Sequence, residues 1–288
     1  MILDLQQLST IDKQYYLQHI IAPRPICFAS TIDKAGQVNL SPFSFFNLFS
    51  TDPAIVVFSP SRRVRDNTIK HTLENVLEVP EVAISIVDYD MVQQTSLASC
   101  EYGKDISEFD KAGFTMQPSQ LVKPPLVKES KAKMECKVLE VKPLGDKGGA
   151  GNLVICEVLC IHLDERIVDG NGRIDQRKLK HVARLGGNWY CKIDETNLFE
   201  VEKPNVKLGI GFDALPESIR NSKVLSGNDL GILANVEVLP QQQPEFSDIH
   251  FEQLLANTNN RLATMHQYAA DLIAAGKIAE AWQVLLRS

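Results

Sequence analysis

Short runs of apolar and β-branched residues, separated by turn-forming residues, dominate the first two thirds of the chain. They occupy residues 25–31, 54–59, 82–88, 133–142 and 153–163, and a shorter run starts at residue 38. Runs of this length and composition favour β-strands. In 153–163 both alternating sets of side chains are largely apolar. We therefore expect one set to fill a barrel and the other to meet a helix or a second subunit.

Helical periodicity interrupts this β pattern in two places. Apolar residues at helical spacing predict a helix over 68–77, capped by Asp66 or Asn67. A second helix is predicted to begin at Asp175 and to end at the glycines at 186 and 187. The turn at Asp33–Gly36 and the glycine-rich stretch 145–151 are predicted to join strands.

The pattern changes after about residue 200. Prolines break up a weakly periodic stretch, and residues 247–288 then have apolar positions at helical spacing. We expect two parts: residues 1–200, and an extension over 201–288 that is irregular and then helical. Because its apolar stripes need cover, the extension is interpreted as an appendage packed on the barrel or on a partner subunit, not as a free domain.

Composition and charge exclude several classes of protein. The 288 residues are 44% hydrophobic and 23% charged, which is ordinary for a folded protein. A net charge of −6 argues against a nucleic-acid-binding protein that relies on a global positive field. No apolar run is long enough for a membrane helix, and residues 1–10 lack the pattern of a signal peptide. A cytoplasmic location is expected, with no nucleic-acid or membrane partner.

The six cysteines form no Cys-x-x-Cys pair and have no partner at zinc-finger spacing. Free, buried thiols are the expected state, and no metal site is predicted. The six histidines are scattered along the chain, so each is interpreted as a surface or packing residue.

The segment 39–47 combines serines, asparagines, a proline and three phenylalanines directly after a short strand. Proline is expected to force the chain out of the strand ladder and to leave backbone amides and carbonyls free for a ligand. A flat heterocycle would use apolar walls for its faces and backbone groups for its polar edge. The alternative is a surface crossover whose phenylalanines plug the end of a barrel.

A basic segment follows at residues 62–72, where Arg62, Arg63 and Arg65 precede the predicted helix start. The amides at a helix N-terminus, together with threonine hydroxyls and Lys70 or an arginine, could hold a phosphate. The alternative is a solvated basic loop beside an ordinary capped helix.

Taken together, these motifs resemble the flavin reductase-like family of FMN-binding split barrels. The resemblance covers about residues 10–195, and the order of the motifs makes it specific. It rests on Pro23–Ile26, Ser30, Thr31, Asp33, Gly36, Asn39–Asn47, Phe58, Ser59, Lys70–Asn75, Glu108–Gly113, Cys136, Glu157, Asp169–Arg173, Arg184–Gly187 and Tyr190. One departure is His71, which stands where the family usually has Asp.

The resemblance implies a six-stranded antiparallel Greek-key split barrel with flanking helices, in a homodimer that binds FMN at or near its interface. It implies that the flavin ring and its ribityl chain are bound by Ser30, Thr31, Asn39, Leu40, Ser41, Pro42, Phe43, Ser44 and Phe46. The implied phosphate contacts are Arg65, Lys70 and Thr72. Arg24 or Arg184 would meet the phosphates of a nicotinamide cofactor, unless each is a structural ion-pair partner.

The implied activity is an NAD(P)H-dependent flavin reductase in which hydride passes from NADH or NADPH to the flavin. No protein side chain is expected to be catalytic, because the chemistry belongs to the flavin. The electron acceptor would be a protein or free flavin. Two alternatives remain: a non-enzymatic flavoprotein that carries electrons or senses redox state with a protein partner, and a scaffold whose C-terminal helices bind a partner.

Overall fold

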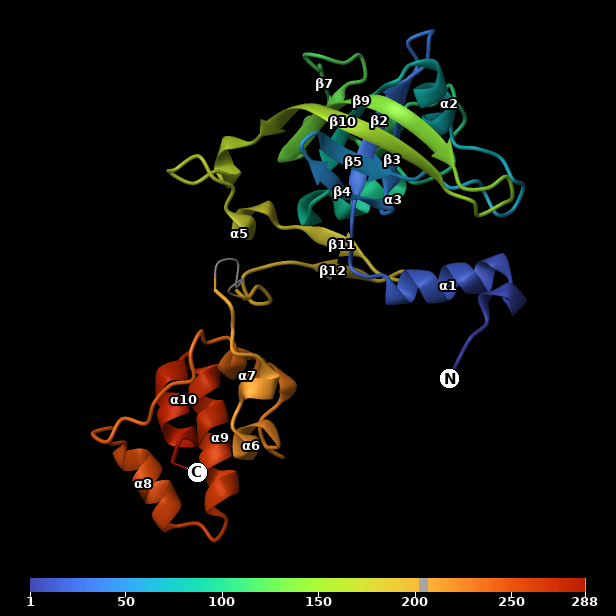
Figure 1. Cartoon of the computed structure of the whole chain (residues 1–288). Helices are drawn as coiled ribbons and strands as arrows, with labels where there is room; N and C mark the ends of the chain where they lie inside the picture. The colour runs from blue at the N-terminus through green and yellow to red at the C-terminus, as the bar shows by residue number, and fades with distance from the viewer. Residues whose placement is uncertain (202–206, 288) are drawn as a thin grey trace. The chain divides into compact units, whose positions relative to one another are not determined.

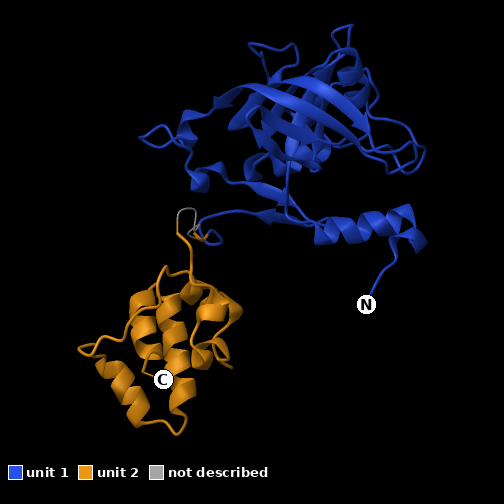
Figure 2. Ribbon diagram, in the orientation of Figure 1, with its two compact units in different colours: residues 1–198 blue, residues 199–288 orange. Residues whose placement is uncertain are grey.

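The computed structural model describes residues 1–201 and 207–287, and it divides the chain into two compact units, Met1–Leu198 and Phe199–Ser288 (Figure 2). The predicted boundary, between residues 200 and 201, falls beside the segment 202–206, which lies outside the described residues. Each unit has its own hydrophobic core and is described separately.

The first unit is built on an antiparallel sheet of seven strands (Figure 1). In sheet order they are β3 (Val38–Phe43), β2 (Cys27–Ile32), β6 (Glu81–Ile86), β9 (Ala132–Pro143), β10 (Asn152–Leu163), β5 (Ala54–Phe58) and β4 (Phe46–Thr51). The mainly β, antiparallel fold expected from the sequence is confirmed, with seven strands in place of six. The long apolar runs that predicted strands become β5, β6, β9 and β10.

The sheet curls until its two edges approach each other. Strands β3 and β4 stand at opposite ends of the sheet order, yet only Ser44 and Phe45 separate them in the sequence. Three peptide steps span at most about 11 Å, so the two edges must lie within that distance where the chain crosses. We call Ser44–Phe45 the crossing; it makes the sheet a split barrel.

Side chains on the two faces of the sheet form two separate clusters. In β2, Cys27 and Ala29 join the cluster inside the barrel, whereas Phe28 joins a second cluster on the outer face. The strand is therefore buried on both sides, and its alternation follows the two-residue period of a β-strand. Pro42 is part of β3 and lies opposite Phe28. The prediction that proline forces the chain out of the ladder is wrong, because an edge strand tolerates a residue without an N–H.

Short helices and strands surround the sheet. The helices are α1 (Thr10–Ile20), α2 (His71–Glu78), α3 (Val92–Leu97), α4 (Glu108–Ala112) and α5 (Gln176–Leu179), with 3₁₀ turns at Leu5–Gln7, Tyr89–Met91 and Glu165–Ile167. Strands β1 (Arg24–Pro25), β11 (Val182–Arg184) and β12 (Tyr190–Lys192) form a three-stranded sheet, and β7 (Met116–Gln117) pairs with β8 (Leu126–Val127).

Two predicted helices differ from the observed ones. Helix α2 begins at His71 and not at residue 68, because the Asp66 carboxylate accepts hydrogen bonds from both the amide and the hydroxyl of Thr68 and closes a turn there. The helix predicted from Asp175 stops after one turn at Lys180, whose φ is 52°. The apolar residues beyond it, Val182 and Ala183, belong to strand β11.

The second unit is helical and encloses its own core. Its helices are α6 (Glu217–Arg220), α7 (Gly227–Ala234), α8 (Ile249–Ala256), α9 (Arg261–Ala274) and α10 (Ile278–Leu285), with a 3₁₀ turn at Phe212–Ala214. The apolar stripes pack against one another around Trp282, Phe251 and Leu233. The predicted helical pattern is confirmed over 249–285, whereas α6 and α7 were missed. The interpretation of this segment as an appendage differs from the structure, since its own helices cover its stripes.

Three of the six free cysteines, Cys27, Cys136 and Cys156, are buried as expected, whereas the other three are partly or fully exposed. Across residues 1–201 and 207–287 we find no helix with the length and apolar character that crossing a bilayer would require.

Candidate functional site

A continuous groove follows strand β3 and the crossing. One part, of about 190 Å³, is lined by Pro42, Phe43 and Ser44 on one side and by Thr95, Ser96 and Ser99 of the α3 region on the other. A narrower part, of about 30 Å³, shares Pro42 and Ser99 with it and adds Asn39, Ser41, Arg63 and Lys70. We call these two parts together the β3 groove. It brings six of the twelve predicted flavin contacts, Asn39, Ser41, Pro42, Phe43, Ser44 and Lys70, to one hollow.

Lys70 is an isolated cation at one end of the β3 groove. Its Nζ lies 5.3 Å from the centre of the Phe43 ring, and among residues 1–201 and 207–287 it has no hydrogen bond or ion pair. Burial, and then the charge of nearby Arg63, lower the pKa of Lys70, and the charge of Glu101 opposes this shift. An ammonium group kept from water without an anionic partner suits an anionic ligand.

Arg63, and not Arg65, is the arginine that lines the groove beside Lys70. Its guanidinium donates to the Thr68 hydroxyl at 2.9 Å and to the Ile69 carbonyl at 2.7 Å, and its side chain is 19% exposed. Arg65 is 71% exposed, and both arginines pair with Glu101, Arg65 at 2.7 Å and Arg63 at 3.2 Å. The loop that carries Arg63 packs directly on the glycine-rich turn, where a Cβ on Gly148 would lie 3.0 Å from the Arg63 carbonyl oxygen.

A buried polar layer behind the groove ties α2 to the sheet. Asn39 Nδ2 donates to Thr72 Oγ1 at 2.9 Å, and Asn75 Nδ2 donates to Thr31 Oγ1 at 3.2 Å. Thr31 and Thr72 are fully buried, so their hydroxyls serve this layer and position the start of α2. Ser30 is also buried, and its hydroxyl has no hydrogen-bond partner among the described residues.

Two more predicted contacts have side chains that belong to the core. Leu40 packs in the cluster on the outer face, and its amide donates to Glu108 Oε2 at 3.0 Å. Phe46 packs against the cluster inside the barrel. The structure therefore places Ser30, Thr31, Leu40, Phe46 and Thr72 behind the groove wall.

Glu108 is one of two acidic residues, with Glu101, that line the narrow part of the groove. It is 6% exposed, and burial raises its pKa although the Leu40 amide favours the charged form. A carboxyl group whose pKa is raised by folding stabilises the fold below its unfolded pKa and loses that contribution as pH rises through the folded value.

As pH rises from about 4.5 to neutral, we expect the free energy of unfolding to fall less in Glu108→Gln than in the wild type. Glutamine keeps an oxygen acceptor for the Leu40 amide but carries no charge to bury. Urea unfolding of both proteins across this range measures the difference. An equal dependence of the free energy of unfolding on pH in the wild type and the variant would contradict this prediction.

Arg184 lines the far end of the β3 groove. It lies beside Tyr190, with the guanidinium 4.5 Å from the ring centre, and donates to the Gly187 carbonyl at 2.6 Å. The groove continues there into a hollow of about 580 Å³ that also includes Asn188 and Lys192. Tyr190 and Lys192 come from β12, so this end is built by the small three-stranded sheet.

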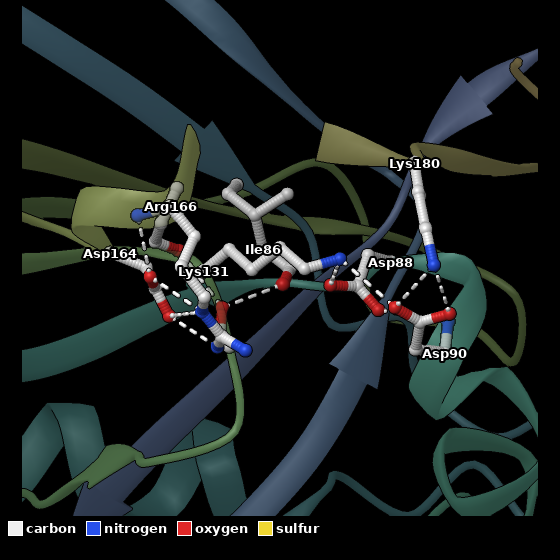
Figure 3. Close-up of polar contacts among 9 residues, drawn as sticks. Ile86, Asp88, Asp90, Lys131, Asp164, Arg166 and Lys180 are labelled. Carbon is white, nitrogen blue, oxygen red and sulfur yellow. Dashed lines mark hydrogen bonds and ion pairs between the residues drawn. The ribbon is translucent and has the colours of Figure 1, made fainter. Parts of the chain in front are cut away.

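An ion-pair network holds the segment before β11 in place (Figure 3). The Lys131 ammonium lies 2.9 Å from Asp88 and 3.0 Å from Asp90, and Lys180 also contacts Asp90 at 3.2 Å. Hydrogen bonds from Lys131, followed by those from Lys180, lower the pKa of Asp90. Because Lys180 directly precedes β11, this network helps to position Arg184.

Arg24 has a different environment from Arg184. It is buried, and its guanidinium donates to the carbonyls of Gln18, Ile21 and Leu185. These bonds tie the end of α1 to the segment after β11. Arg24 lines a second hollow of about 560 Å³ on the Phe45 side of the crossing, which α1 and residues 61–64 complete.

Four residues that line the β3 groove were not predicted as flavin contacts: Arg63, Ser96, Ser99 and Tyr190. Ser96 and Ser99 were missed entirely, whereas Arg63 was named only as one of three arginines in the basic segment and Tyr190 only as part of the family motifs. Ser96 and Ser99 lie three residues apart, a spacing that places both on one side of a helical turn. That spacing was the available signal, but no pattern near it pointed to β3.

The sequence and the fold of the first unit match known proteins. Residues 20–179, more than half of the chain, match the family model described as flavin reductase like domain. A protein from Halalkalibacterium halodurans is 36% identical over 206 residues, which are 71% of this chain and 97% of that protein.

Two solved structures are also similar to this chain. Nitrilotriacetate monooxygenase component B from Bacillus cereus has 29% identity and a TM-score of 0.65, over 70% of this chain and 98% of that one. A putative flavin reductase with a split barrel domain from Shewanella frigidimarina has 25% identity and a TM-score of 0.60, over 70% and 99%. With a split barrel, a groove along β3 and a family model that spans most of the first unit, this chain belongs to the flavin reductase-like family.

Proposed function

We propose that the protein is an FMN-binding oxidoreductase that takes hydride from NADH or NADPH, in the manner of a flavin reductase. The observation that carries the proposal is the β3 groove, which has at one end the Lys70 ammonium, unpaired within the described part of the chain, and Arg184 at the other end. Its walls between these cations combine apolar and hydroxyl groups. Membership of the family and the similarity to a putative flavin reductase support the same activity.

The residues present fit FMN. Lys70 and Arg63 would hold the phosphate, for which a desolvated ammonium and a guanidinium are suitable partners. Ser41–Ser44 would line the ring and the ribityl chain, with Phe43 as an apolar contact and Ser44 as a polar one. Thr31, Thr72 and Asn39 would act indirectly, because they fix α2 and thereby Lys70.

Bound FMN would supply the hydride-accepting centre, so the protein needs no nucleophile of its own. The task of the chain is to bind and orient the two cofactors and to limit access of water. Arg184, Lys192 and Tyr190 at the far end of the groove would bind the negatively charged nicotinamide cofactor.

The direct test is a visible absorption spectrum of the protein reconstituted with FMN, followed by anaerobic addition of NADH and, separately, NADPH. We expect a flavin band that bleaches with at least one donor. A bound flavin that neither donor reduces would favour an electron carrier working with a protein partner. Failure to retain or bind FMN at all would overturn the proposal.

We expect Arg184→Gln to raise the KM for the nicotinamide cofactor by roughly 10-fold, because a charge-assisted contact to a phosphate is lost. The FMN dissociation constant should not change, since Arg184 lies at the end of the groove away from Lys70. Steady-state kinetics with FMN titration measure both quantities. Arg177→Gln is the control, because Arg177 is an exposed arginine paired with Asp175.

We also propose that the chain forms a homodimer. Apolar side chains of α1 and β4 are exposed in the single chain, among them Ile20 at 75% and Phe49 at 67%. Clusters of exposed apolar side chains mark interaction surfaces. Sedimentation of the full chain at micromolar concentration tests this, and a monomer at all concentrations would contradict it.

A further inference from the structure

A cysteine, a histidine and a glutamate converge at the end of the β9–β10 pair that lies away from the turn joining the two strands. Cys160 and His162 are on β10 and Glu135 is on β9, and one potential ligand atom from each lies within 4.8 Å of the other two. His162 Nε2 is 2.7 Å from Glu135 Oε1 and 3.6 Å from Cys160 Sγ. We propose that these three side chains form a binding site for a zinc-type divalent cation, with a fourth position open to water.

A β-bulge brings the three side chains together. Val158 lies opposite Cys136, but Cys160 lies opposite Glu135, so β10 has one extra residue, Leu159, at this point. Without the bulge, Cys160 would lie opposite Met134 and would face away from Glu135, because neighbouring residues of a strand point to opposite faces. Bulges commonly re-aim side chains in this way.

The chemistry of the donors matches a borderline cation. Thiolate sulfur, imidazole nitrogen and carboxylate oxygen are the ligands that Zn²⁺ takes in proteins, and three protein ligands with one open position is a common arrangement. A thiolate and a carboxylate together neutralise a divalent charge. Neutrality is important here because an uncompensated charge is costly to bury. Glu135 is fully buried, and the other two residues are partly buried.

The geometry requires little rearrangement. Zinc–sulfur and zinc–nitrogen bonds at a tetrahedral angle place sulfur and nitrogen about 3.5 Å apart, close to the observed 3.6 Å. The His162–Glu135 separation would have to lengthen by roughly 0.6 Å as the cation replaces the proton between them. His162 would then carry its proton on Nδ1, and the Cys160 thiol would release one proton to solvent.

Backbone amides already hold the carboxylate in position. Glu135 accepts hydrogen bonds from the amides of Gln120, Leu121 and Val122, so the loop around residues 119–124 folds over it. Partners of this kind fix the orientation of a metal ligand. The cation would therefore link β9, β10 and this loop.

The test uses the full-length protein, reduced with a phosphine and freed of metal with a chelator. Competition with a chromogenic chelator measures Zn²⁺ affinity, and Co²⁺ reports a thiolate ligand through its sulfur-to-metal charge-transfer absorption. We expect one equivalent of Zn²⁺ per chain and a Co²⁺–thiolate band. Cys160→Ala should abolish the band, and both Cys160→Ala and His162→Gln should weaken Zn²⁺ binding by roughly 10- to 100-fold or more.

Cys191→Ala is the matched control, because Cys191 is also partly exposed and lies outside the cluster. This variant should keep both the Zn²⁺ binding and the Co²⁺–thiolate band. A cooperative unfolding transition of each metal-free variant verifies that the variant is folded. No stoichiometric Zn²⁺ binding, or binding that survives Cys160→Ala and His162→Gln, would overturn the proposal. Neither readout depends on flavin, so the result is independent of the proposed function.

Discussion

Replacing Lys70 with methionine is expected to weaken FMN binding by roughly 10- to 100-fold, the effect of losing a charge-assisted hydrogen bond. Within residues 1–201 and 207–287 the ammonium forms no ion pair, although the charge of Glu101 acts on it, so the loss falls mainly on the ligand. Methionine keeps an unbranched side chain of nearly the same length but removes the ammonium that lies over Phe43. Fluorescence titration with FMN, whose emission changes on binding, measures the dissociation constant.

The pH dependence of binding gives a second readout of the same residue. Because burial and Arg63 lower the pKa of Lys70, wild-type FMN affinity should fall as pH rises through that lowered value. The variant should lack this fall. Lys34→Met, which removes an exposed lysine from the Asp33–Gly36 turn, should bind FMN as the wild type does. Unchanged affinity in Lys70→Met would show that the phosphate is held elsewhere.

Trp282→Ala is expected to destabilise the second unit by about 3–5 kcal/mol, the cost of removing a large buried aromatic side chain. Trp282 is 1% exposed and packs in the core formed by α7, α9 and α10. The first unit has separate core clusters, so FMN binding and the unfolding of the barrel should not change. Urea unfolding followed by far-UV circular dichroism should show the helical transition shifted to lower urea.

Trp282→Phe provides the comparison. It keeps an aromatic ring in the core and removes an indole N–H that has no hydrogen-bond partner among the described residues. Its cost should be clearly smaller than that of the alanine variant. A single transition that shifts as a whole in Trp282→Ala would instead show that the two units unfold together.

The sequence predicted six of the seven strands of the barrel, because most of them carry β-branched runs bounded by turn residues, whereas β4 was missed. Helix α1 was missed for a physical reason: none of its residues is buried, and its apolar side chains do not gather on one face. The helix after Asp175 was overextended because residues 179, 182 and 183 have helical spacing. That spacing is equally compatible with a turn at Lys180 followed by a strand.

The candidate site was predictable where its residues are neighbours in the sequence, as in Asn39–Ser44. The choice among the arginines was not, because Arg63 and Arg65 both pair with the distant Glu101 and only the fold shows that Arg63 is the one that lines the groove. In the same way, nothing local indicates that the Thr72 hydroxyl accepts a hydrogen bond from Asn39. The convergence of Glu135 with Cys160 and His162 depends on a bulge, which alternation of apolar residues does not reveal.

The crossing at Ser44–Phe45 makes one pair of residues serve two purposes. It joins the two edge strands of the barrel, and it also lines two hollows, with Ser44 in the β3 groove and Phe45 in the hollow beside α1. An insertion at this position would let the two sheet edges move apart, so loop length cannot be used there to admit a larger substrate. Variation in what the protein accepts must instead come from the opposite wall, formed by the α3 region and β12, which can change without opening the barrel.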